Sequence, residues 1–181
     1  MLRRMAPLVT LLASCGQAPV ESTGSRAGSD ASLPTPGGLD DGAIEALAAD
    51  YKGLTRVSTS AFPSRGHQGN PLVNVFVSSA VAPLYSTLDS TGTAPPGFAF
   101  PVGSLLVKEM LDPSGAPPIL TAMYKKAPGY DPSHHDWWYG RLDASGAPTD
   151  PAYVGNVSFC IACHAGATGS DFAWGVPAAN K

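Results

Sequence analysis

Three residues near the end of the chain, Cys160, Cys163 and His164, have the types and the spacing of a redox cofactor site. They form a C-x-x-C-H sequence, which is the attachment pattern of c-type haem. Two thiols at this spacing can add to the two vinyl groups of one porphyrin, and the imidazole that follows then ligates the iron. The motif predicts one covalent haem c, with thioether links to Cys160 and Cys163 and with His164 as the proximal iron ligand.

Two other chemistries use a pair of cysteines at this spacing. A thioredoxin-like disulfide is expected near the start of a chain and next to a βαβ unit, whereas this motif lies near the end. A structural zinc site needs four ligands, so His164 and the two cysteines would require one more, such as His134 or His135. The haem interpretation is favoured because it needs no further residue.

The N-terminus predicts export. Residues 1–4 carry two arginines, and residues 5–13 form an apolar run that is too short to span a bilayer. Small residues precede Cys15, as in a bacterial lipoprotein signal, so we expect removal of residues 1–14 and lipid attachment to Cys15. An ordinary signal peptide that contains a cysteine by chance is the alternative.

Cysteine usage agrees with a lipoprotein. The chain has three cysteines, so two on haem and one on lipid leave no free thiol in an oxidising compartment. Acyl chains would anchor the protein to a membrane surface without a spanning helix. We therefore expect a lipoprotein that faces the periplasm, and Gly16, where an inner-membrane lipoprotein carries aspartate, favours the outer membrane.

Composition divides the remaining chain into a tether and one domain. Residues 15–39 are rich in Ser, Gly, Pro and Ala, and such a stretch cannot bury enough apolar surface to order itself. Residues 40–181 are sufficient for one core. The formal net charge is −3 and no run of basic residues occurs, which argues against a nucleic-acid partner.

The domain is predicted to be α+β and mainly antiparallel β. Residues 40–51 form one amphipathic helix, with an aspartate as cap and with Ile44, Leu47 and Ala48 on one face. Residues 154–164 should form a short helix that carries the cysteines. Four apolar runs bounded by turn formers predict strands: Leu72–Val77, Leu105–Leu111, Ile119–Lys125 and 136–142.

Two of these strands end in nearly the same sequence, at 111–117 and 142–148. Each copy places an aspartate at a turn start and a glycine where a positive φ is expected. We interpret the pair as turn chemistry and not as a domain repeat.

The predicted strands exclude the helical cytochromes. The chain contains 18 prolines, and interior proline costs a helix about 3 kcal/mol, so a four-helix cytochrome does not fit. A small electron-transfer cytochrome c ends in a long helix, but glycine and proline interrupt the segment after His164.

Several segments, in this order and spacing, resemble the cytochrome P-460 family. The resemblance extends from about residue 51 to residue 174. The segments are 100–109 (FPVGSLLVKE), 123–125 (MYK), 129–132 (GYDP), 136–139 (DWWY), 159–165 (FCIACHA) and 170–171 (SD).

The resemblance implies a mostly antiparallel β domain, usually a homodimer, that holds a five-coordinate haem. Cytochrome P-460 itself oxidises hydroxylamine and has a lysine crosslinked to its haem, whereas the related cytochrome c′-β proteins bind nitric oxide in an apolar distal pocket. Cys160, Cys163 and His164 match the family's attachment residues and proximal ligand, and Lys108 matches the crosslinking lysine. Alternatively, Lys108 faces solvent on an edge strand. Alternation places Lys108 on one face of the strand and Glu109 on the other. Each face therefore carries one charge, and the pattern does not tell whether Lys108 faces the haem or the solvent.

Two departures from the family pattern weigh against the enzyme. No acid occurs in residues 120–122, where the family places a distal proton acceptor, and the early strand at 72–76 lacks the expected arginine. Hydroxylamine oxidation releases protons and needs a base. We therefore expect binding of a small diatomic ligand, NO or CO. The alternatives are an electron-transfer cytochrome with a sixth ligand and a protein partner, and an oxidoreductase that acts on hydroxylamine or a similar nitrogenous compound.

Several residues are candidates for the surroundings of the iron. Met110 or Met123 could supply a thioether ligand, although a methionine on a strand usually fills a core. Three phenylalanines could wall a distal pocket or simply pack the core. Those phenylalanines are Phe76, Phe98 and Phe100.

Polar and aromatic candidates complete this set. His67, His134 or His135 could ligate the iron. Asp171 could orient the proximal side or cap a turn. An aromatic run is expected to pack the core and the haem edge: Trp137, Trp138 and Tyr139.

Overall fold

A computed structural model describes residues 38–181, apart from 65 and 68. The predicted signal peptide, the lipid site at Cys15 and nearly all of the tether lie outside the described residues. The elements are α1 (Asp41–Ala49), η1 (Tyr51–Gly53), β1 (Thr55–Arg56), β2 (Phe62–Pro63), β3 (Leu72–Val77), η2 (Ser79–Val81), α2 (Ala82–Tyr85), β4 (Leu105–Leu111), β5 (Ile119–Lys125), η3 (Pro132–His134), β6 (Trp137–Leu142), η4 (Pro151–Tyr153), β7 (Val154–Gly155), α3 (Ser158–His164), η5 (Ala165–Ser170) and η6 (Ala178–Asn180).

The strands form one antiparallel sheet in the order β1-β3-β4-β5-β6-β7, and β2 pairs with β3 beside β1. This arrangement confirms the predicted fold class. The four long strands coincide with the predicted ones, except that β6 begins one residue later. β-branched and aromatic residues pack well on a pleated sheet, so the runs rich in them predicted the positions of these strands.

Helix α1 is shorter than predicted, and one of its residues faces the other way. The carboxylate of Asp40 accepts a hydrogen bond from the Ala43 amide at 2.8 Å and caps the first turn. Ile44 and Ala48 are fully buried, whereas Leu47 is 45% exposed. The prediction for Leu47 was wrong because Ile44 and Ala48, four residues apart, define a narrower stripe that excludes Leu47.

Helix α3 also begins later than predicted, at Ser158 and not at residue 154. Val154 and Gly155 instead pair with β6 as the edge strand β7. Gly155 has a φ of 89°, which ends regular structure before the helix starts. The cysteine motif is thereby confined to a helix of two turns.

The two strand exits with similar sequences form similar turns. Asp112 accepts a hydrogen bond from the Ser114 amide at 2.7 Å, and Asp143 accepts one from Ser145 at 2.8 Å. The glycine that follows each serine has a positive φ, 80° at Gly115 and 89° at Gly146. The prediction of turn chemistry is confirmed.

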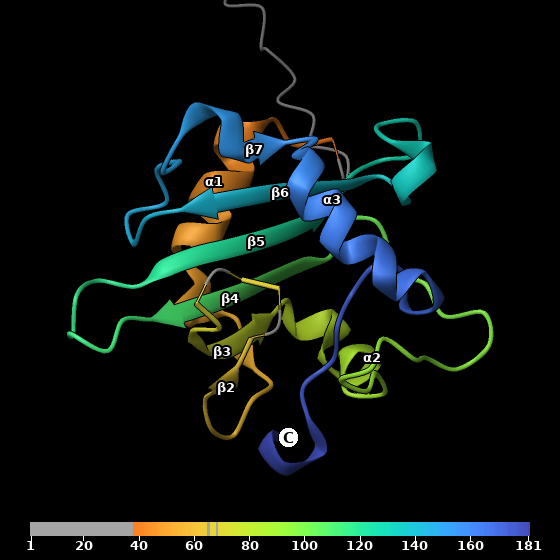
Figure 1. Cartoon of the computed structure of the whole chain (residues 1–181). Helices are drawn as coiled ribbons and strands as arrows, with labels where there is room; N and C mark the ends of the chain where they lie inside the picture. The colour runs from red at the N-terminus through yellow and green to blue at the C-terminus, as the bar shows by residue number, and fades with distance from the viewer. Residues whose placement is uncertain (1–37, 65, 68) are drawn as a thin grey trace, which may run out of the picture. The chain divides into compact units, whose positions relative to one another are not determined.

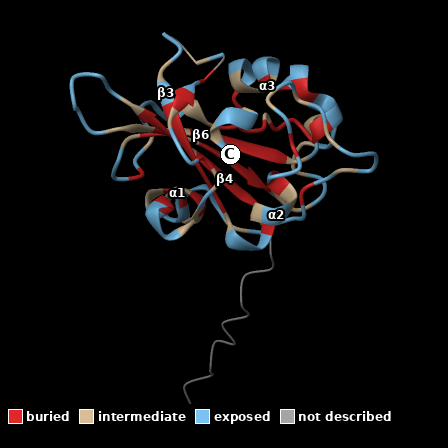
Figure 2. Ribbon diagram, turned by 90° about the horizontal axis from the view of Figure 1, so that it is seen from below, coloured by how far each residue is buried: buried red, intermediate tan, exposed pale blue. Residues whose placement is uncertain are grey.

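The sheet separates two layers. Helix α1 covers one face and α3 lies across the other (Figure 1), and burial is concentrated in the strands between them (Figure 2). Alternation along β4 sends Leu105, Val107 and Glu109 towards α1. Leu106, Lys108 and Met110 face α3. No helix in the described part of the chain has the length and apolar character needed to cross a bilayer.

Candidate functional site

A cavity of about 670 Å³ lies between α3 and the sheet. This volume is within the range of cofactor and small-molecule sites. The strands contribute mainly the side chains that face α3, and α3 and the loop before β3 close the cavity. Its lining includes Gly66, His67, Val75, Leu106, Lys108, Met110, Asp112, Thr121, Met123, Tyr139, Arg141, Tyr153, Phe159, Cys160, Cys163, His164 and Trp174.

Helix α3 brings the two cysteines to this cavity. Cys160 and Cys163 are one turn apart, so both side chains lie on the same side of the helix. Both are free thiols, and burial raises the pKa of Cys160 to about 11. The loop before β3 touches Cys163 closely: a Cβ on Gly66 would lie 2.5 Å from the Cys163 sulfur, and Gly66 has a φ of 85°. A side chain at position 66 would be strained by this φ and would displace the Cys163 side chain.

The imidazole of His164 is neutral and has a nitrogen lone pair that can bind a metal. It is 9% exposed, and its Nδ1 lies 2.6 Å from the carbonyl oxygen of Phe172. Because a carbonyl only accepts, Nδ1 carries the proton and the Nε2 lone pair of the neutral ring remains available. Burial, with the charge of Lys108, lowers the pKa of His164 to about 4. The ring is therefore neutral at neutral pH.

Lys108 projects into the same cavity. Strand β4 pairs with both β3 and β5, so Lys108 is not on an edge strand, and the solvent-facing alternative does not apply. Burial lowers the pKa of Lys108 to about 8. The ammonium has no hydrogen bond or ion pair with any residue that the structure describes. Tertiary structure thus settles which of the two charges on β4 faces the motif.

Two further charged residues line the cavity, and sequence reasoning missed both. Arg141 comes from β6 and Asp112 follows β4, whereas the search for an arginine and an acid covered the early strand and residues 120–122. The Asp112 carboxylate is engaged by the amide and hydroxyl of Ser114, which hold its pKa below the usual value. The period-two pattern of β6 could have assigned Arg141 to the Tyr139 face.

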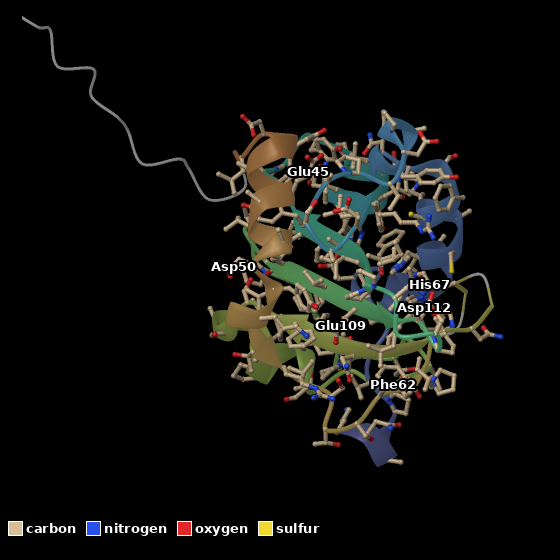
Figure 3. All side chains as sticks on the ribbon, turned by 90° about the vertical axis from the view of Figure 1, so that its left-hand side faces the viewer. Glu45, Asp50, Phe62, His67, Glu109 and Asp112 are labelled. Carbon is tan, nitrogen blue, oxygen red and sulfur yellow. The ribbon has the colours of Figure 1, made fainter. Side chains whose placement is uncertain are left out.

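His67 is the histidine besides His164 that the structure places at the cavity (Figure 3). Its Nδ1 lies 2.8 Å from the hydroxyl of Ser64, and Ser64 is buried. Burial, with the charge of Lys108, lowers its pKa to about 3. A neutral His67 that donates from Nδ1 to Ser64 would leave Nε2 free for a ligand.

His134 and His135 lie elsewhere. The Nδ1 of His134 is 2.8 Å from Asp131 and that of His135 is 2.7 Å from Asp171. Within residues 38–181, leaving aside 65 and 68, no three His, Cys, Asp or Glu side chains gather as metal ligands. The donor set therefore does not fit the zinc interpretation.

The three phenylalanines do not line the cavity. Phe76 lies on the opposite face of the sheet, where its ring contacts Tyr51 edge-on at 5.1 Å. Phe98 and Phe100 pack against each other in the core beside Trp137. Their side chains therefore do not form the wall of an apolar distal pocket at this cavity.

Met110, Met123 and Tyr139 do line the cavity. Both methionines are 8% exposed and belong to the core on the α3 side. The ring of Tyr139 lies 5.4 Å from that of His164, and its buried hydroxyl finds no hydrogen-bond partner among the residues described. Buried polar groups in folded proteins are nearly always hydrogen-bonded, so a group bound in this cavity could supply the partner of the Tyr139 hydroxyl.

The residues at this cavity fit a haem c. Two free thiols on one side of a helix, a neutral imidazole with its Nδ1 proton engaged and an unpartnered Tyr139 hydroxyl adjoin a cavity of suitable volume. Lys108 and Arg141 supply cations that could meet carboxylates such as haem propionates. We found no match to this chain among family models, curated proteins or solved structures.

Proposed function

We propose that this protein carries one haem c, bound through Cys160 and Cys163 and ligated by His164, and that it binds a small diatomic ligand such as NO or CO. The observation that carries this proposal is the position of His164, whose neutral ring adjoins the cavity beside both cysteines. The proposal keeps the resemblance to the cytochrome P-460 family, and within that family it favours the cytochrome c′-β type.

The haem would supply an iron with one open coordination position, and the chain would control access to it. The Phe172 carbonyl fixes the tautomer of His164, so that Nε2 is the ligating atom. Val75, Leu106 and Met110 give the cavity an apolar wall, which suits an uncharged diatomic molecule. Lys108 stands within this wall as a proton donor at neutral pH.

A second candidate function is electron transfer with a sixth ligand. His67 favours it, because this neutral imidazole lines the cavity and Ser64 orients its Nδ1. A metal-bound histidine usually engages its other nitrogen in this way. Such a protein would reduce and oxidise a partner and would show a low-spin iron without added ligand.

Hydroxylamine oxidation is less well supported. Lys108 is suitably placed for a haem crosslink, because it lies in the cavity and part of it is neutral near pH 8. Asp112 is the acid at the cavity, but Ser114 engages it and its lowered pKa makes it a weak base. The site therefore offers the lysine without an effective proton acceptor.

The cellular context completes the proposal. The N-terminal sequence supports a lipoprotein that is anchored through Cys15 and faces the periplasm, with the outer membrane favoured. A homodimer follows from the family resemblance.

An absorption spectrum of the mature protein tests these functions together. The protein is produced with a c-type haem maturation system and examined as isolated, after dithionite, and after CO. Ligand binding predicts a high-spin five-coordinate spectrum that changes on CO addition. A low-spin spectrum before CO supports electron transfer instead, and a colourless protein with no mass gain on its C-terminal peptide contradicts haem attachment.

A further inference from the structure

The hydrogen bond to His164 depends on an unusual turn. The Phe172 carbonyl, eight residues beyond His164, accepts from its Nδ1. Asp171 and Phe172 both have left-handed backbone conformations, with φ of 54° and 64°. Neither is glycine, and a bulky residue with positive φ persists only where its surroundings hold it.

Asp171 is the residue that holds this turn. Its side chain is fully buried, and the Lys125 ammonium donates to both carboxylate oxygens at 2.8 Å. The amide of Phe100 donates to the carboxylate at 2.8 Å. The backbone carbonyl of Asp171 accepts from the Trp137 indole at 2.8 Å. The turn is thus attached to the sheet at both its side chain and its backbone.

Phe172 is fixed from its other side. Its amide donates to the carbonyl of Ala167 at 2.8 Å, and its buried ring contacts the ring of His135 at 5.0 Å between centroids. His135 in turn places Nδ1 2.7 Å from the Asp171 carboxylate. The carbonyl of Phe172 therefore has little freedom to move away from His164.

We propose that Asp171 is a positioning residue that holds the Phe172 carbonyl on Nδ1 of His164 and so sets how strongly His164 donates electrons to bound iron. This inference rests on the proposed haem function. A stronger hydrogen bond from Nδ1 makes the imidazole a better donor, which favours ferric iron and lowers the reduction potential. The turn around Asp171 thereby holds the reduction potential below the value it would have with a weaker hydrogen bond at Nδ1.

The test compares Asp171→Asn with Asp131→Asn in the mature haem protein. Asparagine tolerates positive φ, and its one oxygen can still accept from Phe100. Asp171→Asn therefore chiefly removes the ion pair with Lys125 and the oxygen that faces His135. Asp131 is a matched charge control. Both carboxylates raise the pKa of Tyr139, Asp131 the more strongly, but Asp131 makes no hydrogen bond to the 171–172 turn. Its partner His134 touches that turn through a ring contact with Phe172, at 6.0 Å between centroids.

Two measurements separate positioning from charge. One is the reduction potential, and the other is the NMR resonance of the His164 Nδ1 proton in the CO-bound ferrous form. Asp171→Asn should raise the reduced-to-oxidised ratio about tenfold at a fixed electrode potential, which is about 59 mV for one electron. It should also move the Nδ1 proton upfield. Asp131→Asn can raise the potential through its field, but it should leave the Nδ1 proton in place.

Each outcome decides the inference. An Nδ1 resonance that is the same in Asp171→Asn and the unaltered protein would overturn it while haem binding stands. If Asp171→Asn does not fold, His135→Gln replaces it, because His135 is half-exposed and this change keeps the charge of Asp171. A smaller upfield shift in His135→Gln supports the inference, and no shift contradicts it. Lack of haem in the unaltered protein would overturn both this inference and the proposed function.

Discussion

The two faces of the sheet treat adjacent charged residues in opposite ways. Glu109 points towards α1 and is satisfied there by hydrogen bonds from Tyr51, Lys52 and Asn74, at 2.6, 2.5 and 2.8 Å. Lys108, its neighbour on β4, points towards α3 and has no such partner within the described residues (Figure 3 shows Glu109 on the α1 side). The carboxylate on the α1 face accepts three hydrogen bonds, whereas the ammonium on the α3 face makes none with the described residues.

This difference supports the α3 face as the candidate functional site. As a rule, the buried polar groups of a protein are hydrogen-bonded, and the exceptions occur mainly at functional sites. On the α3 face, the buried Tyr139 hydroxyl breaks it beside His164, and the half-buried Lys108 ammonium lies in the same cavity. The α1 face breaks it only at the Trp138 indole among the buried side chains described.

The largest expected effect comes from removing both thiols. Cys160→Ser with Cys163→Ser should abolish covalent haem, because no thioether bond can then form. Absorbance of the denatured, acid-extracted protein and the mass of the C-terminal peptide measure this loss. Haem that stays covalently bound in this variant would contradict the assigned attachment residues.

Lys108 should make the absorption spectrum of the haem depend on pH. Because burial lowers its pKa to about 8, the amine is protonated below that pH and neutral above it. A neutral amine can ligate iron, so we expect a high-spin to low-spin change as the pH rises from 7 to 9. Lys108→Leu should remain high-spin throughout; a transition that survives this substitution would assign the new ligand to another residue.

Glu109→Gln should affect stability and leave the spectrum unchanged. Burial alone would raise the pKa of Glu109, yet hydrogen bonds from Lys52, Tyr51 and Asn74 hold it below the usual value. Its contribution is therefore present above pH 4.5 and is lost as the pH falls through the lowered pKa. Urea unfolding at pH 7 should show a loss of about 1–3 kcal/mol, shrinking towards pH 3.

Asp50→Asn, at an exposed residue after α1, serves as the control for this substitution and should change unfolding by less than about 0.5 kcal/mol. A shifted haem spectrum in Glu109→Gln would show that the two faces are coupled.

The smallest effect is expected at the two similar turns. Asp112 lines the cavity and Asp143 does not, but both cap their turns in the same way. Asp112→Ala and Asp143→Ala should lower the midpoint of thermal unfolding slightly and equally, with no change in CO affinity. A loss of ligand affinity in Asp112→Ala alone would assign that carboxylate a role at the iron.

Local sequence patterns were enough to predict the main elements and the motif. Period-two alternation and turn formers located β3, β4 and β5, and the C-x-x-C-H spacing identified Cys160, Cys163 and His164 as one unit. These are local signals, carried by residues within a few positions of one another.

The set of residues that share the site depends on how the chain folds. The register of four strands brings Lys108 and Arg141 to the α3 face and takes Phe76 to the other, and a turn anchored by Asp171 supplies the acceptor for His164. Alternation tells which residues of one strand share a face, but which face α3 covers depends on the pairing of segments tens of residues apart. The register of the sheet and the turn at residues 171–172 set the positions of these residues, and both exist only in the folded chain.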